Sequence, residues 1–318
     1  MQLRNLFLIS ALLLGLFLEQ FAVSLQGSLI YILCFMMSLS LQSISISIFK
    51  PQLKILKPII STILLNYFLF GIILMLLVYL IIPYEKALYI GFLMIAVAPP
   101  GVVIVPFAVR MKSDINYAAL GVVGAYLFTI ILFPLTLFLL GVEVDFMNVF
   151  KLIFYSVVLP MFISRIFRYP AIFKFTKKHQ SLLIDISFFI LIYVVIGINK
   201  SVLVHDFRVS ILPLLVLGIL LFPIAIGLLF LLKKLQKSKE ISTNFSLLLM
   251  VKNNGFSAVS SLTLFGTVAS IPSAALSVVL LLYLIALPGI MDFIYKKPKQ
   301  LELVEQIDLE SKLELKLK

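Results

Sequence analysis

The chain has 318 residues, of which 62% are hydrophobic and only 13% are charged, and its mean hydropathy is +1.18. Soluble domains carry about a quarter charged residues, so this composition excludes a water-soluble globular protein. A membrane-spanning helix needs roughly 20 apolar residues, which leaves room for about ten spans and for no soluble catalytic domain. The net charge of +12 would suggest a nucleic-acid partner in a soluble protein; in a membrane protein we interpret it as the charge of cytoplasmic loops, with no nucleic acid involved.

Cysteine and histidine are too scarce for several kinds of chemistry. Cys34 is the single cysteine, so disulfides and cysteine metal clusters are excluded. His179 and His205 are the only histidines, and both lie near charged loop sequence. We therefore expect neither a metal nor a cofactor.

Ten apolar runs are long enough to span a membrane, and they predict an all-α polytopic membrane protein. In chain order they are Leu6 to Val23, Ser28 to Ile48, Pro58 to Pro83, Ala87 to Val109, Ile115 to Gly141, Val149 to Phe167, Leu182 to Ile198, Val209 to Leu232, Ser242 to Phe265 and Ala274 to Ile294. The first run resembles a signal peptide, but no convincing small-residue cleavage pattern precedes Ser24, so we interpret it as a span.

The distribution of Lys and Arg predicts the orientation. When loops are assigned alternately to the two sides, 21 of the 26 basic residues fall on one side. The other side holds only Lys86, Lys151, Lys200 and Arg208, and Lys252 alone lies deep inside a span. This bias predicts that both termini are cytoplasmic. We expect the protein in the plasma (inner) membrane of a bacterium.

Two of the ten spans are interrupted near their middles. The fourth contains Pro99, Pro100 and Gly101, and consecutive prolines remove backbone donors and clash with the preceding turn. The ninth contains the sequence Lys-Asn-Asn-Gly at residues 252–255, where asparagine and glycine disfavour helix and a buried lysine is costly. We expect both helices to be unwound at these points.

The positions of the two breaks predict an internal symmetry. Each break lies in the fourth span of a group of five, and because five is odd, the two groups would insert with opposite topology. Residues 1–141 would form the first five-helix repeat, residues 142–295 the second and inverted repeat, and residues 296–318 a cytoplasmic tail. Inverted repeats with discontinuous helices at corresponding positions are the layout of many secondary transporters, in which the breaks meet near the bilayer midplane.

Three stretches resemble the bile acid:sodium symporter superfamily. The first is Pro99, Pro100 and Gly101 with the Arg110, Lys112 and Asp114 loop and the long span that follows; the second runs from Leu248 through Lys252, Asn253, Asn254, Gly255, Ser257 and Ala258 to Pro272; the third is Met36 to Ser40. This resemblance implies a core domain of the third to fifth and eighth to tenth spans. It also implies a panel of the remaining spans that moves against the core, and an organic anion bound between them.

The chain departs from the family pattern where the family binds sodium. By the resemblance, the polar pair of the sodium site falls on Ile104 and Val105, the acidic residue on Leu248 and the glutamine on Lys252, whereas Asn66 and Asn253 fall on polar positions of the family. Aliphatic side chains cannot ligate a cation, and a fixed ammonium would repel one.

We therefore hypothesise that Lys252 occupies the place of the coupling cation, and that transport is sodium-independent or proton-linked. Lys252 could carry a proton or attract an anionic substrate directly. The alternative is a structural lysine that is salt-bridged or snorkels to a water-filled vestibule, and Asp185 is one possible partner. The candidate substrate- and ion-binding residues are Asn66, Pro100, Gly101, Lys252, Asn253, Asn254, Gly255 and Ser257.

Two other functions remain open, and a third is not expected. An auxin efflux carrier-like permease shares the crossed-helix plan and usually lacks such a sodium constellation. A structural or sensory membrane protein would need no cargo. An intramembrane enzyme would need a catalytic set of Ser and His, paired acids or a metal within the spans, which the sequence does not offer, so we expect no enzyme.

Overall fold

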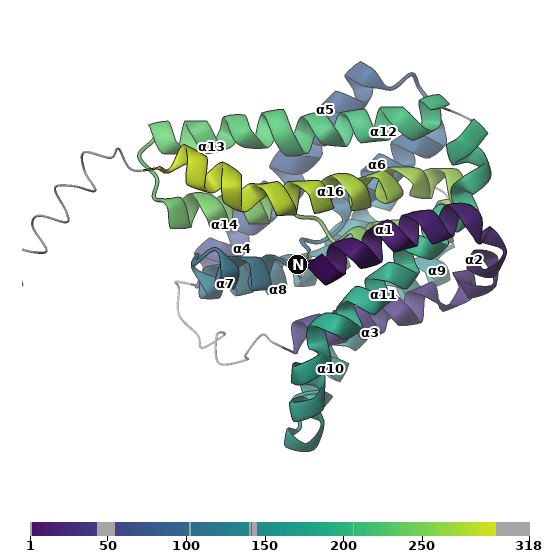
Figure 1. The fold of residues 1–318 in the computed structure, drawn as a ribbon, viewed down its shortest axis with the longest axis horizontal. Coiled ribbons are helices and arrows are strands. Elements are labelled where there is room, and N and C mark those ends of the chain that lie inside the picture. The colour runs from purple at the N-terminus through teal and green to yellow at the C-terminus, as the bar shows by residue number, and fades with distance from the viewer. Residues whose placement is uncertain are drawn as a thin grey trace, which may run out of the picture.

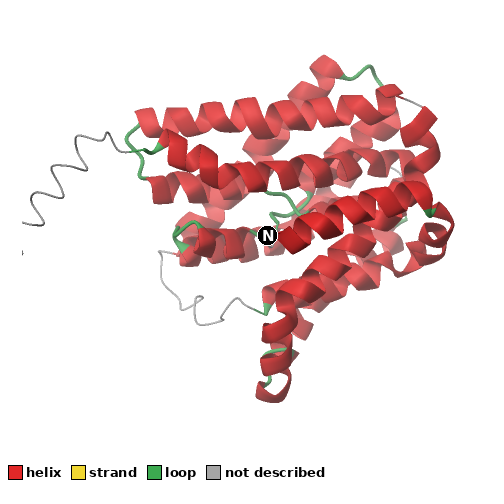
Figure 2. Cartoon of the chain, in the orientation of Figure 1, coloured by secondary structure: helices red, strands yellow, loops and turns green. Residues whose placement is uncertain are grey.

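The computed structural model describes residues 2–42, 55–101, 103–139, 141, 145–205 and 207–296. Within these ranges every regular element is a helix (Figure 2). Seven helices among the described residues are long and apolar enough to cross a membrane, so the protein is a helical, multi-pass membrane protein. They run Glu19–Leu41, Leu56–Ile81, Ile115–Leu139, Phe146–Ile166, Pro170–Lys200, Arg208–Lys234 and Thr267–Ile294.

The helices pack in two groups (Figure 1). The α11 group consists of α1 (Gln2–Phe17), α2 (Glu19–Leu25), α3 (Leu29–Leu41), α9 (Phe146–Ile153), α10 (Leu159–Ile166) and α11 (Pro170–His205). The α16 group consists of α4 (Leu56–Ile63), α5 (Phe70–Ile81), α6 (Lys86–Val97), α7 (Ile104–Arg110), α8 (Ile115–Leu139), α12 (Phe207–Ile219), α13 (Ala225–Lys234), α14 (Lys239–Met250), α15 (Asn254–Phe265) and α16 (Thr267–Ile294). Helix α11 contacts α1, α2 and α3 within its own group, and it contacts α12, α15 and α16 across the boundary.

Three of the long helices contain a π-helical segment, at Leu64–Leu69, Phe154–Val158 and Leu220–Ile224. Such segments widen the backbone locally and occur often at functional sites. The first of them carries Asn66 and Tyr67, whose side chains are buried in the α16 group.

The seven long helices correspond to seven of the ten predicted spans. The other three are the first span and the two interrupted ones. The prediction of one helix from Leu6 to Val23 is wrong, because α1 ends at Phe17 and α2 begins at Glu19. Glu19 lies at the positively polarised N-terminal end of α2 and pairs with Lys200 of α11 at 3.1 Å, which favours a new helix start at this acidic residue.

Two predicted starts also lie too late in the sequence. Helix α11 begins at Pro170 instead of Leu182, since its first turns are rich in basic residues, which a search for apolar runs omits although lysine is a good helix former. Helix α16 begins at Thr267 instead of Ala274, directly after Gly266, whose φ of +85° ends α15. The end of the second predicted span, the boundary between residues 141 and 142 and all but the first residue of the predicted tail lie outside the described residues.

Candidate functional site

Both predicted helix breaks occur in the structure. Helix α6 ends at Val97 and α7 begins at Ile104, so the chain is extended through the two prolines. Helix α14 ends at Met250 and α15 begins at Asn254. Each break leaves the C-terminal end of one short helix and the N-terminal end of another inside the α16 group.

The two breaks cross and hydrogen-bond to each other. Pro100 and Lys252 form an antiparallel bridge, in which the Gly101 amide donates to the Val251 carbonyl at 2.8 Å and the Asn253 amide donates to the Pro99 carbonyl at 2.7 Å. Non-helical backbone at membrane depth is tolerated only where its polar groups are satisfied within the protein, and this pairing satisfies them. We call this feature, residues 98–101 and 251–254, the crossover.

Gly101 permits the close approach of the two non-helical segments of the crossover. A Cβ atom at this position would lie 2.9 Å from both the Lys252 carbonyl oxygen and Val251 Cγ1. Because the carbonyl belongs to the paired backbone, it cannot move aside without disturbing the bridge. Any larger residue here would therefore separate the two breaks.

The Lys252 side chain extends from the crossover into the protein, and only 1% of the residue is exposed. Its ammonium donates to the Asn66 carbonyl oxygen at 3.0 Å, to Asn66 Oδ1 at 2.8 Å and to the Ala96 carbonyl oxygen at 2.9 Å. Its Nζ also lies 4.9 Å from the centroid of the Tyr67 ring and 5.0 Å from that of Phe70. An ammonium has three N–H donors, so these three acceptors use all of them.

These contacts resemble the shell of a bound cation. Three oxygens and two aromatic faces surround the charge. Ala96 lies in the last turn of α6, where carbonyls lack intrahelical partners and where the negative end of the helix dipole lies. Asn66 is held in place because its Nδ2 donates to the carbonyl of Leu248, near the end of α14, at 2.9 Å. The Tyr67 hydroxyl donates to the Ala125 carbonyl at 2.8 Å, which fixes the ring.

The two asparagines that follow Lys252 organise the start of α15. Asn253 caps the helix by accepting from the Phe256 amide at 3.1 Å, and its Nδ2 donates to the Tyr126 hydroxyl at 2.8 Å and to Met37 Sδ at 3.2 Å. Asn254 donates to the Ser277 hydroxyl of α16. The side chain of Asn253 therefore connects the crossover to α8 and to α3 of the other helix group.

Gly255 and Ser257 have packing roles next to the crossover. A Cβ at Gly255 would lie 3.1 Å from both Leu33 Cδ1 and Met36 Cε of α3, so the glycine allows α15 to approach the α11 group. Ser257 donates to the Asn254 carbonyl at 3.1 Å and accepts from the Ser273 hydroxyl at 3.0 Å.

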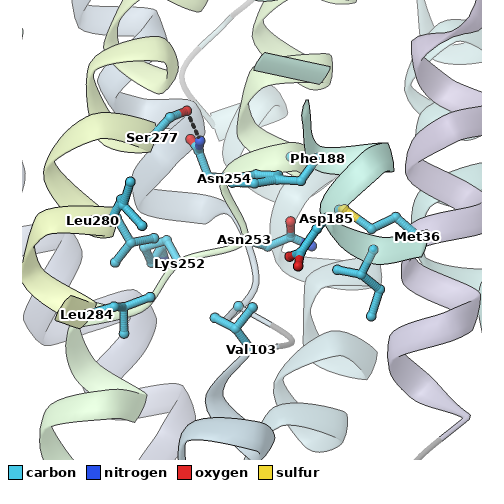
Figure 3. A pocket seen from close by; sticks show the side chains of 14 residues that line it. Met36, Val103, Asp185, Phe188, Lys252, Asn253, Asn254, Ser277, Leu280 and Leu284 are labelled. Atoms are coloured by element: carbon cyan, nitrogen blue, oxygen red, sulfur yellow. Dashed lines mark hydrogen bonds between the residues drawn. The ribbon is translucent and has the colours of Figure 1, made fainter. Parts of the chain in front are cut away.

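A cavity of about 60 Å³ lies between the crossover, α11, α3 and α16 (Figure 3). Its lining residues are Met36, Gly101, Val103, Ile184, Asp185, Phe188, Lys252, Asn253, Asn254, Gly255, Ser277, Leu280, Leu281 and Leu284. The wall is mostly apolar with a few polar groups, which is typical of small-molecule sites. The cavity lies at the boundary of the two helix groups.

Five of the eight predicted site residues line the cavity, and the other three lie outside its lining. Gly101, Lys252, Asn253, Asn254 and Gly255 line the cavity. Pro100 pairs with the Lys252 backbone and Asn66 binds the Lys252 ammonium, both away from the cavity lining, while Ser257 lies one turn into α15.

The aromatic and carbonyl partners of Lys252 and most of the cavity wall were not predicted from the sequence. Tyr67 and Phe70 could have been proposed, because they neighbour Asn66 on one helix. The contribution of Ala96 is a backbone carbonyl, for which side-chain patterns carry no signal.

The structure also distinguishes between the expectations for Lys252. Snorkelling to an aqueous vestibule is wrong, because the residue is buried. Asp185 lines the same cavity, but the three hydrogen bonds of the ammonium go to Asn66 and Ala96.

Three of the positions at which the family resemblance places sodium ligands carry aliphatic side chains, and of these Val105 is half-buried. Ile104 and Leu248 are both fully buried. Among the described residues, no group of three or more His, Cys, Asp or Glu side chains is placed to hold a metal ion.

A comparison of the chain with models of known protein families finds no match, and a comparison with curated proteins finds none either.

Proposed function

We propose that the protein is a secondary transporter that moves a small organic molecule by alternating access, without sodium, and that Lys252 occupies the place of a coupling cation. The observation that carries this proposal is the crossover of two interrupted helices with an ammonium coordinated at its centre. Transporters of several folds bind substrate and ions where discontinuous helices meet at the repeat interface.

The packing of the helices supports a two-body mechanism. The α11 group contains the helices that the family resemblance assigns to a moving panel, and the α16 group contains those assigned to a core. The cavity lies between the groups, so a rigid-body movement of one against the other would expose it to one side of the membrane and then to the other. We further propose ten spans in two inverted repeats, with both termini in the cytoplasm.

The shell of Lys252 supports sodium independence. A sodium ion at the crossover would need the same oxygens of Asn66 and Ala96 that accept from the ammonium, and it would lie against a fixed positive charge. The tethered ammonium cannot dissociate into solution, so the site is occupied at any sodium concentration. The resemblance implies that the cargo is an organic anion.

The test is uptake by proteoliposomes of a panel of radiolabelled organic anions, organic cations and neutral metabolites. Each compound is measured with an inward sodium gradient and with potassium in its place. We expect saturable uptake of at least one compound at equal rates in both. Strong stimulation by sodium would contradict the assignment of Lys252, and absence of flux for the whole panel would favour a structural or sensory protein.

Matched variants connect the flux to the crossover. Lys252→Gln should reduce the initial rate at least tenfold, because it removes the charge that the surrounding oxygens coordinate. Lys200→Gln removes a lysine from a part-exposed pair with Glu19 on the same protein, and it should stay within twofold of the parent. Equal rates in both variants would show that Lys252 has no special role.

A further inference from the structure

The turn between α10 and α11 carries positive charge that no acidic residue nearby in the sequence balances. Its five basic residues are Arg165, Arg168, Lys174, Lys177 and Lys178. The sequence contains no acidic residue between Asp145 and Asp185. The basic loop between α13 and α14 differs, because its Lys239 pairs with Asp292 at 2.5 Å. The α10–α11 turn is therefore a surface at which an anion from outside the chain can supply the missing charge.

Contacts with α3 give this turn a fixed shape. Arg165 Nη2 donates to the Leu41 carbonyl oxygen at 3.0 Å, and Gln180 Nε2 donates to the Leu39 carbonyl oxygen at 2.6 Å. The end of α10 and the early turns of α11 therefore both lie against the end of α3. Figure 1 shows the turn between them protruding from the body of the molecule.

Three lysines share one face of α11 beyond the turn. Lys177 and Lys178 follow Lys174 by three and four residues, and all three are exposed. Lys177 Nζ lies 5.4 Å from the centroid of the Phe173 ring. Within the part of the chain that the structure describes, no carboxylate pairs with any of these three ammonium groups. Each ammonium has three N–H donors to offer a ligand. We call these residues the lysine face.

An exposed apolar stripe adjoins the lysine face. Ile172, Phe175 and Leu182 are 38%, 61% and 39% exposed. Their spacing of three and then seven residues places them on one side of α11. Tyr169 in the turn is also exposed, and tyrosine is enriched at membrane–water interfaces. A helix segment that is basic on one face and aromatic and aliphatic on the next lies at the boundary between headgroups and acyl chains.

The length of α11 places its first turns at the membrane surface. Its 36 residues form a helix about 54 Å long, whereas the hydrocarbon core of a bilayer is about 30 Å thick. At a tilt of about 40°, the upper end of the usual range, the helix still extends about 41 Å along the bilayer normal. Because the apolar run of α11 begins only at Leu182, the excess includes its basic beginning.

An open groove lies in the turn itself. Its lining residues are Arg165, Ile166, Arg168, Tyr169, Pro170 and Ile172. Guanidinium groups bind phosphate through two parallel hydrogen bonds, and basic pockets between membrane helices bind anionic headgroups. The groove therefore combines groups that bind phosphate with apolar side chains that suit an acyl chain.

We propose that the α10–α11 turn binds an anionic phospholipid, whose phosphate lies at Arg168 and the lysine face and whose acyl chains lie along the apolar stripe. The lipid belongs to the leaflet that is cytoplasmic in the proposed topology. A soluble phosphate ester offers the same charge, but it would leave Ile172 and Phe175 without an apolar partner. Because the turn belongs to the α11 group, a bound lipid holds that group at the membrane surface. The inference goes beyond the proposed transport function and does not depend on it.

Two lipids with the same acyl chains test the charge preference. Binding of radiolabelled palmitoyl-oleoyl phosphatidylglycerol to the detergent-solubilised protein is measured, and unlabelled phosphatidylglycerol or phosphatidylcholine is added as competitor. We expect phosphatidylglycerol to compete at least tenfold more strongly. Raising the ionic strength from about 0.01 M to about 1 M shortens the Debye length from about 30 Å to about 3 Å and should weaken its binding. Equal competition by the two lipids, or binding indifferent to salt, would overturn the inference without any variant having to fold.

Triple variants assign the preference to the lysine face. Changing all three of its lysines to glutamine should weaken phosphatidylglycerol binding at least fivefold, whereas changing them to arginine keeps the charge and should keep the binding. The matched control is Lys112→Gln with Lys234→Gln and Lys237→Gln, which removes three exposed charges from other loops on the same predicted side. It should stay within twofold of the parent. Equal losses in the two glutamine triples would show that net charge, not this turn, attracts the lipid, and would overturn the inference.

The deacylated headgroup distinguishes a lipid from a soluble ligand. Glycerophosphoglycerol carries the phosphate of phosphatidylglycerol without its acyl chains, and we expect it to leave lipid binding unchanged at concentrations at which the intact lipid competes fully. Competition as strong as that of the intact lipid would overturn the lipid assignment and indicate a site for soluble phosphate esters. None of these measurements involves flux, so their failure would leave the proposed transport function intact, and absence of transport would leave the lipid site intact.

Discussion

Replacing Lys252 with methionine tests the energetics of the crossover most sharply. Methionine keeps an unbranched side chain of similar volume and removes the ammonium, so three oxygen acceptors lose their donors: both Asn66 oxygens and the Ala96 carbonyl. An unsatisfied buried acceptor costs about 1–3 kcal/mol. Burial of the ammonium itself costs several kcal/mol, which the variant recovers. Three acceptors at mid-range cost about 6 kcal/mol, and the recovered burial cost of the ammonium is about 3 kcal/mol, so we expect a net loss of about 3 kcal/mol.

The assay uses the single cysteine of the chain. Cys34 is free and buried, so a thiol-reactive dye reports unfolding of the detergent-solubilised protein without any added label site. Denaturant titration followed by this reaction gives the change in unfolding free energy. No tryptophan is present to provide a comparable intrinsic signal.

A double-mutant cycle then separates the coordination from general packing. Asn66→Leu removes one acceptor side chain, and combining it with Lys252→Met should cost less than the sum of the two single changes by more than 1 kcal/mol, because the lost partners belong to one network. Strictly additive losses, or a Lys252→Met variant as stable as the parent, would refute the view that the oxygens coordinate the ammonium.

Two further predictions concern the surroundings of Lys252. Gly101→Ala should destabilise the protein by roughly 1–3 kcal/mol in the Cys34 assay, because the new Cβ meets backbone at 2.9 Å; Gly227→Ala, where nothing lies within 4 Å, should be neutral or stabilising, and equal effects of the two changes would contradict the close approach. Tyr67→Phe keeps the ring over the ammonium and loses the hydroxyl bond to Ala125, so it should cost about 1 kcal/mol, and Tyr67→Leu, which also removes the aromatic face, should cost more; the reverse order would argue against a cation–π contribution.

The sequence predicted the interrupted helices well because their chemistry is local. Two prolines in succession and the run of residues 252–255 break a helix whatever surrounds them. The helix ends were less predictable. A search for apolar runs finds segments that suit contact with lipid. Such a search omits the basic first turns of α11 and joins α1 to α2 across Leu18.

The site itself was predictable only in part. That Lys252 lay at mid-span was visible in the sequence, whereas its coordination depends on the Ala96 carbonyl and on a π-helical turn that turns Asn66 toward it. The place of Asp185 in the cavity wall was also hidden, because it depends on how the two helix groups pack. Long-range packing of this kind leaves no periodic signal in a single sequence.

The most direct test of the account asks whether a free cation can replace the Lys252 ammonium. Lys252→Ala leaves the oxygens of Asn66 and Ala96 around an empty space, and the thermal stability of this variant is measured by Cys34 reactivity in methylammonium, sodium, potassium or choline chloride at one ionic strength. The account predicts that methylammonium or sodium stabilises the variant in a saturable manner while the parent is indifferent to the cation, since ligand binding to the folded state raises stability. Sodium-specific stabilisation of the parent, or a variant that responds to none of the cations, would contradict the claim that Lys252 stands in the place of a coupling cation.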